Sequence, residues 1–148
     1  MITVIQRVSK AKVIIDNKVY SQIEKGIVIL LGICQNDTEK DVVKLVEKIV
    51  NLRIMADNQD RMNLSLKDAN CQVLVVSQFT LCSNLKSGRR PDFNKVMAPK
   101  PAWHLYDLFA KQLQFHLRTV ATGSFGARMA VELINDGPVT FILDSNQI

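Results

Sequence analysis

The stretch of residues 73–81 constrains the fold of this chain more than any other. It reads Val-Leu-Val-Val-Ser-Gln-Phe-Thr-Leu, and its apolar, β-branched first half is typical of a strand that is buried on both faces. Its second half places Ser77, Gln78 and Thr80 at the end of that strand. A buried strand that ends in an amide and two hydroxyls either satisfies these groups locally or presents them to a ligand. The stretch therefore predicts a central strand with a candidate site at its end.

A second polar stretch, residues 135–140, separates the apolar runs 129–134 and 139–143. It reads Asn-Asp-Gly-Pro-Val-Thr, a composition typical of a sharp turn, and we interpret it as the tip of a hairpin. We expect the two polar stretches to form one site across a subunit boundary.

The length of 148 residues, with no repeat, low-complexity tract or linker, indicates a single domain spanning residues 1–148. A hydrophobic content of 47% and a charged content of 22% are ordinary for globular proteins. No apolar run approaches the ~20 residues of a membrane helix. We therefore expect a cytoplasmic protein with no membrane partner.

The cysteines and the net charge bear on compartment and partners. Cys34, Cys71 and Cys82 are odd in number and lack a C-x-x-C spacing, which predicts reduced, structural thiols. The net charge of +5 favours a polyanionic partner.

Apolar periodicity predicts an α+β fold. Alternating or continuous apolar runs predict strands at residues 2–8, 11–15, 19–23 and 27–33, and helical spacing predicts helices from Asp37 or Thr38 to about Leu52 and onward from Pro101. Between these, residues 82–101 hold three prolines and five cations and form a long loop. Strands on either side of separated helices predict a curved, mostly antiparallel, barrel-like sheet with two main packed helices.

The sequence offers few residues for metal or nucleophilic catalysis. His104 and His116 are the only histidines, on different faces of one predicted helix. We therefore expect no metal site and no Ser-His or Cys-His nucleophile. The chain also lacks a P-loop and a dinucleotide fingerprint, so we expect no cofactor.

Both polar stretches leave alternatives open. The hydroxyls of residues 77–80 could bond the backbone with Phe79 in the core, or a backbone N–H and the Gln78 amide could polarise a carbonyl as an oxyanion hole does. Thr80 would be a nucleophile only beside a base, and the sequence shows none. Gly137 and Pro138 could form a simple turn, or their carbonyls could hold a protonated α-amino group. The cations of residues 86–100 face solvent or meet phosphates.

Six short motifs follow one another along the whole chain. They are Gln-Arg-Val at 6–8, Met-Asn-Leu-Ser-Leu at 62–66, Ser-Gln-Phe-Thr-Leu at 77–81, Gly-Arg-Arg-Pro at 88–91, Thr-Gly-Ser-Phe-Gly-Ala at 122–127 and Asn-Asp-Gly-Pro-Val-Thr at 135–140. Together they resemble the D-aminoacyl-tRNA deacylases. Arg128 departs from the family pattern, which suggests an acidic or polar residue there. The resemblance implies a homodimer that hydrolyses the ester between a D-amino acid and the 3′ end of tRNA.

The resemblance also implies roles for single residues. The Gly137–Pro138 bond would be cis and would enter the partner's pocket, where its carbonyls bind the substrate amino group. Arg7 would support the orientation of this pair. The pocket itself would be formed by the catalytic stretch Gln78, Phe79 and Thr80, by Ser77, and by Phe125 and Met129 as neighbours.

The implied chemistry needs no metal and no cofactor. In that family the terminal 2′-hydroxyl of tRNA assists hydrolysis, and glycine esterified to tRNA is accepted because L side chains are rejected rather than D side chains recognised. The implied partner is aminoacyl-tRNA, with no DNA. Two alternatives remain: a tRNA-binding module without catalysis, and a small-ester hydrolase with Thr80 as nucleophile.

Overall fold

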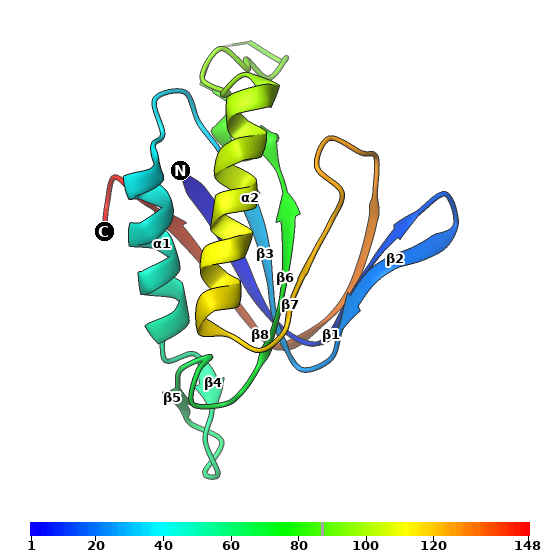
Figure 1. The fold of residues 1–148 in the computed structure, drawn as a ribbon, viewed down its shortest axis with the longest axis vertical. Helices are drawn as coiled ribbons and strands as arrows, with labels where there is room; N and C mark the ends of the chain where they lie inside the picture. Colours follow the sequence, from blue (N-terminus) through cyan, green and yellow to red (C-terminus); the bar gives the residue numbers. More distant parts are fainter. Residues whose placement is uncertain (87) are drawn as a thin grey trace.

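The computed structural model describes residues 1–86 and 88–148, and it contains a six-stranded sheet with two helices packed on one face (Figure 1). The strands are β1 (Ile2–Ile15), β2 (Lys18–Ile23), β3 (Gly26–Gly32), β6 (Gln72–Ser77), β7 (Val120–Thr122) and β8 (Ala130–Asp144). The helices are α1 (Glu39–Asn51) and α2 (Pro99–His116), and β4 (Met55–Ala56) pairs with β5 (Met62–Leu64) separately. The α+β class and the two packed helices are confirmed.

The sheet is mixed because helices make two of its connections. Strand β1 pairs antiparallel with β2, β3 and β8, whereas β6 lies parallel to both β3 and β7. A parallel pair needs a crossover, which α1 provides between β3 and β6 and α2 provides between β6 and β7. The C-terminal ends of β3 and β6 therefore meet at one edge of the sheet.

The buried run of β6 is confirmed, and it lies between two apolar clusters. Val73 and Val75 pack with the helices, whereas Leu74 and Val76 pack into the second cluster on the opposite side of the curved sheet. Alternate residues of a strand point to opposite faces, so a strand covered on both faces must be apolar throughout.

Helix α1 begins where the sequence indicates a start, and α2 begins two residues earlier than predicted. In α1, the Thr38 N–H donates to Asp41 Oδ2 at 2.8 Å, and Val42, Leu45 and Ile49 are buried on one face. Helix α2 begins at Pro99, two residues before the predicted Pro101, because its first turn tolerates residues without an N–H. None of the described helices is long and apolar enough to cross a membrane.

The expected hairpin tip at residues 135–140 is wrong. Both apolar runs belong to the single strand β8, which pairs with β1 along nearly its whole length. The runs predicted at 2–8 and 11–15 are likewise one strand, β1. Because β1 is long enough to pair with both runs of β8, the polar residues between them form a bulge rather than a turn.

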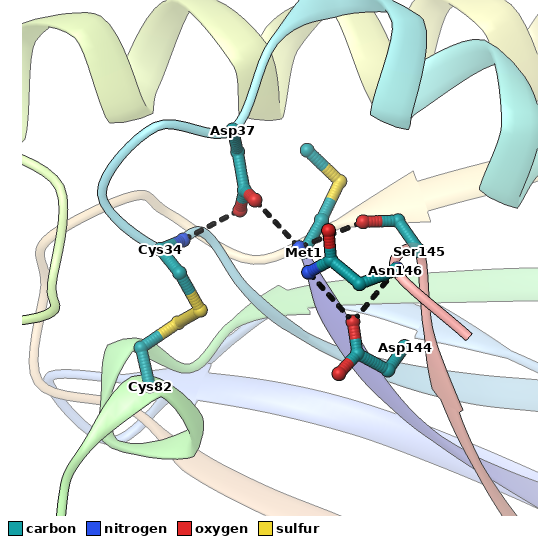
Figure 2. Close-up of a disulfide and its surroundings, with 7 residues drawn as sticks. All are labelled: Met1, Cys34, Asp37, Cys82, Asp144, Ser145 and Asn146. Carbon is teal, nitrogen blue, oxygen red and sulfur yellow. Dashed lines mark hydrogen bonds and ion pairs between the residues drawn. A yellow bond between two sulfur atoms is a disulfide. The ribbon is translucent and has the colours of Figure 1, made fainter.

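The prediction that all three cysteines are reduced is also wrong. Cys34 and Cys82 form a disulfide (Figure 2). Cys71 is free and buried. Cys34 follows the end of β3 and Cys82 follows the end of β6, so the parallel pairing of these strands brings the two Cα atoms within 5.4 Å. Cysteine count and spacing carry no information about this pairing.

Candidate active site

A pocket of about 500 Å³ opens where β6 ends, beside the start of α2. Ser77, Gln78 and Phe79 form one wall, and Phe125 and Met129 form another. The structure thus brings five of the predicted site residues together. Most of the remaining wall is apolar, and a small number of polar groups in an apolar pocket is typical of a ligand site.

The polar wall arises because the chain leaves the sheet at Gln78. The Gln78 N–H donates to the Leu31 carbonyl at 2.7 Å, and the 3-10 helix η1 (Phe79–Cys82) follows directly. The first N–H groups of a helix have no acceptor within it. The start of η1 therefore offers backbone donors beside the Gln78 side chain.

Phe79 and Thr80 both lie on the surface. Phe79 is 54% exposed, with its ring centroid 5.3 Å from that of Phe93, so the alternative that buries Phe79 in the core is wrong. Thr80 does not line the pocket, and its hydroxyl accepts a hydrogen bond from Gln78 Nε2 at 2.5 Å. Within the described residues this is the one side-chain hydrogen bond of Thr80, so no base contacts its hydroxyl.

Tyr106 holds the second wall in place. Its hydroxyl donates to the Val75 carbonyl at 2.9 Å, and its ring lies 5.4 Å from that of Phe125, centroid to centroid. Burial raises the pKa of Tyr106, so the phenol stays neutral and remains a donor. Gly123 leaves room for Met129, because a Cβ at this position would lie 2.8 Å from Met129 Sδ.

The disulfide attaches η1 to the loop after β3. Asp37 fixes that loop, since Asp37 Oδ2 accepts the Cys34 N–H at 2.6 Å and Oδ1 pairs with the Met1 ammonium at 2.6 Å (Figure 2). The end of η1 is therefore joined to a region that is itself held by an ion pair.

The Gly137–Pro138 pair protrudes from β8 as a bulge. Gln6 pairs with Thr140 and Val8 with Asn135, so the four residues 136–139 lie opposite Arg7 alone. The Gly137–Pro138 peptide bond is cis, as the resemblance implies, and Gly137 has a φ of +129°. A Cβ on Gly137 would lie 2.7 Å from Val139 Cγ2, so the position is restricted to glycine by both space and conformation.

Arg7, on the neighbouring strand β1, supports the bulge. It is 8% exposed, and its Nε donates to the Asp136 carbonyl at 3.1 Å and lies 3.2 Å from Asp136 Oδ2. Its Nη1 donates to the Ile54 carbonyl at 2.8 Å. A buried guanidinium with these partners fixes the backbone just before Gly137.

Pocket and bulge lie apart within one protomer. Arg7, Gly137 and Pro138 do not line the pocket. Arg7 contacts Ile54, which precedes β4, and the β4–β5 pair lies at the opposite end of the molecule from the start of α2 (Figure 1). One chain alone therefore does not bring the two polar stretches together.

Metal-ligating side chains do not gather in the described part of the chain. No group of three or more His, Cys, Asp or Glu residues there could hold an ion. His104 is on the surface of the helix layer, where its Nε2 lies 3.4 Å from Glu39 Oε1.

Comparison with known proteins shows what this architecture is similar to. The family model described as D-Tyr-tRNA(Tyr) deacylase matches residues 4–144. The D-aminoacyl-tRNA deacylase of a Sulfurihydrogenibium species is 51% identical, with complete coverage of both chains. The chain belongs to the D-Tyr-tRNA(Tyr) deacylase family. The matched residues contain both the pocket and the Arg7-supported bulge.

Two solved structures share the fold of this chain. The c-Myc DNA Unwinding Element Binding Protein superposes with a TM-score of 0.93 at 39% identity, covering 97% of this chain and 98% of the other. A probable eukaryotic D-amino acid tRNA deacylase superposes with a TM-score of 0.83 at 16% identity, which shows a shared fold.

Sequence reasoning missed several residues of the site in this family member. Tyr106 belongs to none of the motifs described above, although a buried tyrosine needs a partner for its hydroxyl and could have been singled out on that ground. Met97 and Val96 also line the pocket from the long loop. No local pattern in the sequence indicates that this loop folds against β6.

Proposed function

We propose that this protein hydrolyses the ester bond of D-aminoacyl-tRNA and spares L-aminoacyl-tRNA. The observation that carries the proposal is the pocket at the end of β6, in a chain 51% identical over its full length to a relative named D-aminoacyl-tRNA deacylase. A pocket of this size suits an aminoacyl group joined to a nucleoside.

The proposed chemistry uses donors rather than a nucleophilic side chain. N–H groups at the start of η1, with the Gln78 amide, would stabilise the negative charge that develops on the ester oxygen. Water adds to the carbonyl carbon, and the 3′ oxygen of the terminal adenosine leaves with a proton. The neighbouring 2′-hydroxyl of the tRNA would assist this transfer. Among the described residues no base contacts the Thr80 hydroxyl, which supports this route over a covalent intermediate.

The proposed chiral selection requires a second copy of the chain. Among the described strands β8 pairs with β1 alone, so its other edge is open, and Ile134, Phe141 and Ile142 on β8 are exposed. Exposed apolar side chains on an edge strand favour association with another copy of the chain. In the resulting homodimer, the bulge of one protomer would enter the pocket of the other.

Inside the pocket the bulge would act as a steric filter. The carbonyls of Gly137 and Pro138 would accept hydrogen bonds from the substrate α-amino group, while rigid backbone occupies the space that an L side chain needs. An apolar pocket distinguishes two side chains by only ~1–3 kcal/mol per methylene. Steric exclusion of the L side chain by rigid backbone therefore discriminates more strongly between L and D substrates. Glycine has no side chain to exclude, so glycyl-tRNA should also be hydrolysed. We place the reaction in the cytoplasm, where aminoacyl-tRNA is used.

The direct test is deacylation of D-aminoacyl-tRNA, L-aminoacyl-tRNA, glycyl-tRNA and a free D-amino acid ester. We expect turnover of the D- and glycyl-tRNA substrates, little of the L-tRNA, and none of the D substrate when the terminal 2′-hydroxyl is replaced by hydrogen. Binding of tRNA without any turnover would instead indicate a binding module. Hydrolysis of the free ester alone would indicate a small-ester hydrolase.

A further inference from the structure

We infer that residues 84–86 and 88–100 form a docking surface for the phosphate backbone of the RNA whose 3′ end occupies the pocket. This inference rests on the proposed function. We name this segment the basic loop. It contains five cationic side chains and one acidic one, and its net charge of +4 is most of the +5 of the whole chain. The cations are Lys86, Arg89, Arg90, Lys95 and Lys100.

The charges of the basic loop are available to a ligand. All five cationic residues are exposed. Within the described part of the chain, none of their side chains takes part in an ion pair or a hydrogen bond. Exposed guanidinium and ammonium groups without an acidic partner match phosphate, which arginine can bind with two parallel hydrogen bonds.

The basic loop is anchored by backbone hydrogen bonds at two places. Asn84 and Asp92 exchange N–H to carbonyl bonds at 2.8 and 3.0 Å, and the Gln35 N–H donates to the Lys95 carbonyl at 2.7 Å. The disulfide fixes Cys82 just before it, and the Phe93 ring contacts Phe79. Anchoring of this kind lowers the entropy lost when a ligand orders the surface.

The position of the basic loop relates its charge to the pocket. Val96, Met97 and Pro99 line the pocket, so Lys95 and Lys100 directly adjoin lining residues in the chain. The loop lies at the end of the molecule where α2 begins and β6 ends (Figure 1). An RNA with its 3′ ester in the pocket would pass its preceding phosphates over this surface.

The start of α2 adds to the positive potential at the same place. Its first turn contains Lys100 and no acidic residue, whereas α1 has Glu39 and Asp41 in its first turn. Acidic residues there are favourable because the N-terminal end of a helix carries partial positive charge. The first turn of α2 therefore contributes no acidic side chain that would offset this partial charge.

The experiment compares a tRNA substrate with one that lacks the stem. The variants are Arg89→Gln with Arg90→Gln, and Lys95→Gln with Lys100→Gln. The matched control is Lys18→Gln with Lys48→Gln, which removes two exposed lysines from β2 and α1. For each protein, kcat/KM is measured across a salt series on D-aminoacyl-tRNA and on D-aminoacyl-adenosine.

We expect each basic-loop variant to lose about 10-fold or more in kcat/KM on the tRNA, because each phosphate contact adds to a salt-dependent electrostatic affinity. The slope of log kcat/KM against log salt should become shallower by about 0.7–0.9 per contact removed. Activity on D-aminoacyl-adenosine should stay unchanged, and the control variant should match the unsubstituted protein on both substrates.

Several results would overturn the inference. Unchanged activity of the variants on both substrates would show that the basic loop only faces solvent and contacts no RNA. Equal loss on both substrates would show that the substitutions disturb the pocket.

Direct binding of uncharged tRNA, duplex DNA and poly-glutamate adds a readout independent of catalysis. Loss of affinity confined to the duplex DNA or the poly-glutamate would assign the surface to another partner. Failure of the proposed function is distinguishable, since the unsubstituted protein would then hydrolyse neither ester.

Discussion

At the scale of single residues, Tyr106 connects the helix layer to the pocket. Tyr106→Phe removes the hydroxyl that donates to the Val75 carbonyl, which keeps the Gly123 N–H as a donor at 2.8 Å. We expect the free energy of unfolding to fall by about 0.5–1.5 kcal/mol in denaturant titrations, the contribution of one hydrogen bond. The ring contact with Phe125 should survive, so a loss well above this range would indicate that the wall itself collapses.

The same side chain should make stability depend on alkaline pH. Burial raises the pKa of Tyr106 above its ordinary value near 10. The stability that its neutral form provides is therefore complete below pH 10 and decreases as the pH rises above 10. In Tyr106→Phe this part of the decrease should be absent. Parallel stability curves for the two proteins above pH 10 would contradict the assignment.

Thr80 gives a residue-scale test of the mechanism. Its hydroxyl contacts the Gln78 amide and no base among the described residues. We expect Thr80→Ala to reduce kcat far less than the ~10⁶-fold seen when a true nucleophile is removed from a hydrolase. Gln78→Ala serves as the comparison and should cost more. A covalent ester trapped on Thr80 and identified by mass spectrometry would reverse this conclusion.

At the scale of elements, the disulfide decides how firmly η1 is held. The bond joins residues 48 positions apart, and closing a loop of that size stabilises a fold by about 2–4 kcal/mol. We expect a dithiol reductant to lower the melting temperature and kcat/KM of the unsubstituted protein. The double variant Cys34→Ser with Cys82→Ser should have the lower melting temperature and the lower kcat/KM even without reductant, and neither value should change when the reductant is added.

This comparison also identifies the working state of the enzyme. Disulfides persist mainly in oxidising compartments, whereas the proposed reaction belongs in the cytoplasm. Equal melting temperatures with and without reductant would show that the bond does not support the fold in solution.

At the scale of the whole molecule, the distance between pocket and bulge predicts a shared site. Gln78→Ala disables the pocket, and Gly137→Ala with Pro138→Ala disables the bulge. In a mixed dimer, one composite site contains both sets of substitutions, and the other composite site contains neither. Random exchange makes about half of the dimers mixed, so roughly a quarter of all sites should be intact, and activity should recover to about that share.

Two controls make this experiment decisive. An alanine at position 137 is strained by the φ of +129° and the nearby Val139, so unfolding curves must show that the variant homodimer is folded. Mass spectrometry must show that mixed dimers form. Flat activity in confirmed mixed dimers would place each site within one chain.

The sequence by itself determined the elements whose burial or capping can be read from the pattern of their own residues. The run of residues 73–76 must be apolar because both faces of β6 are covered, and α1 carries its cap and its buried stripe in its own residues. The polar residues Ser77, Gln78 and Thr80 could likewise be singled out, because a buried strand that ends in an amide and hydroxyls must satisfy them locally or present them to a ligand.

Only the tertiary structure decided the features that depend on partners distant in the chain. Residues 135–140 form a bulge because β1 continues past them, and nothing within the stretch specifies the length of its neighbour. Cys34 and Cys82 meet because β3 and β6 run parallel, which follows from the crossover through α1. Turn propensity and cysteine spacing are local quantities, whereas strand pairing depends on the whole fold.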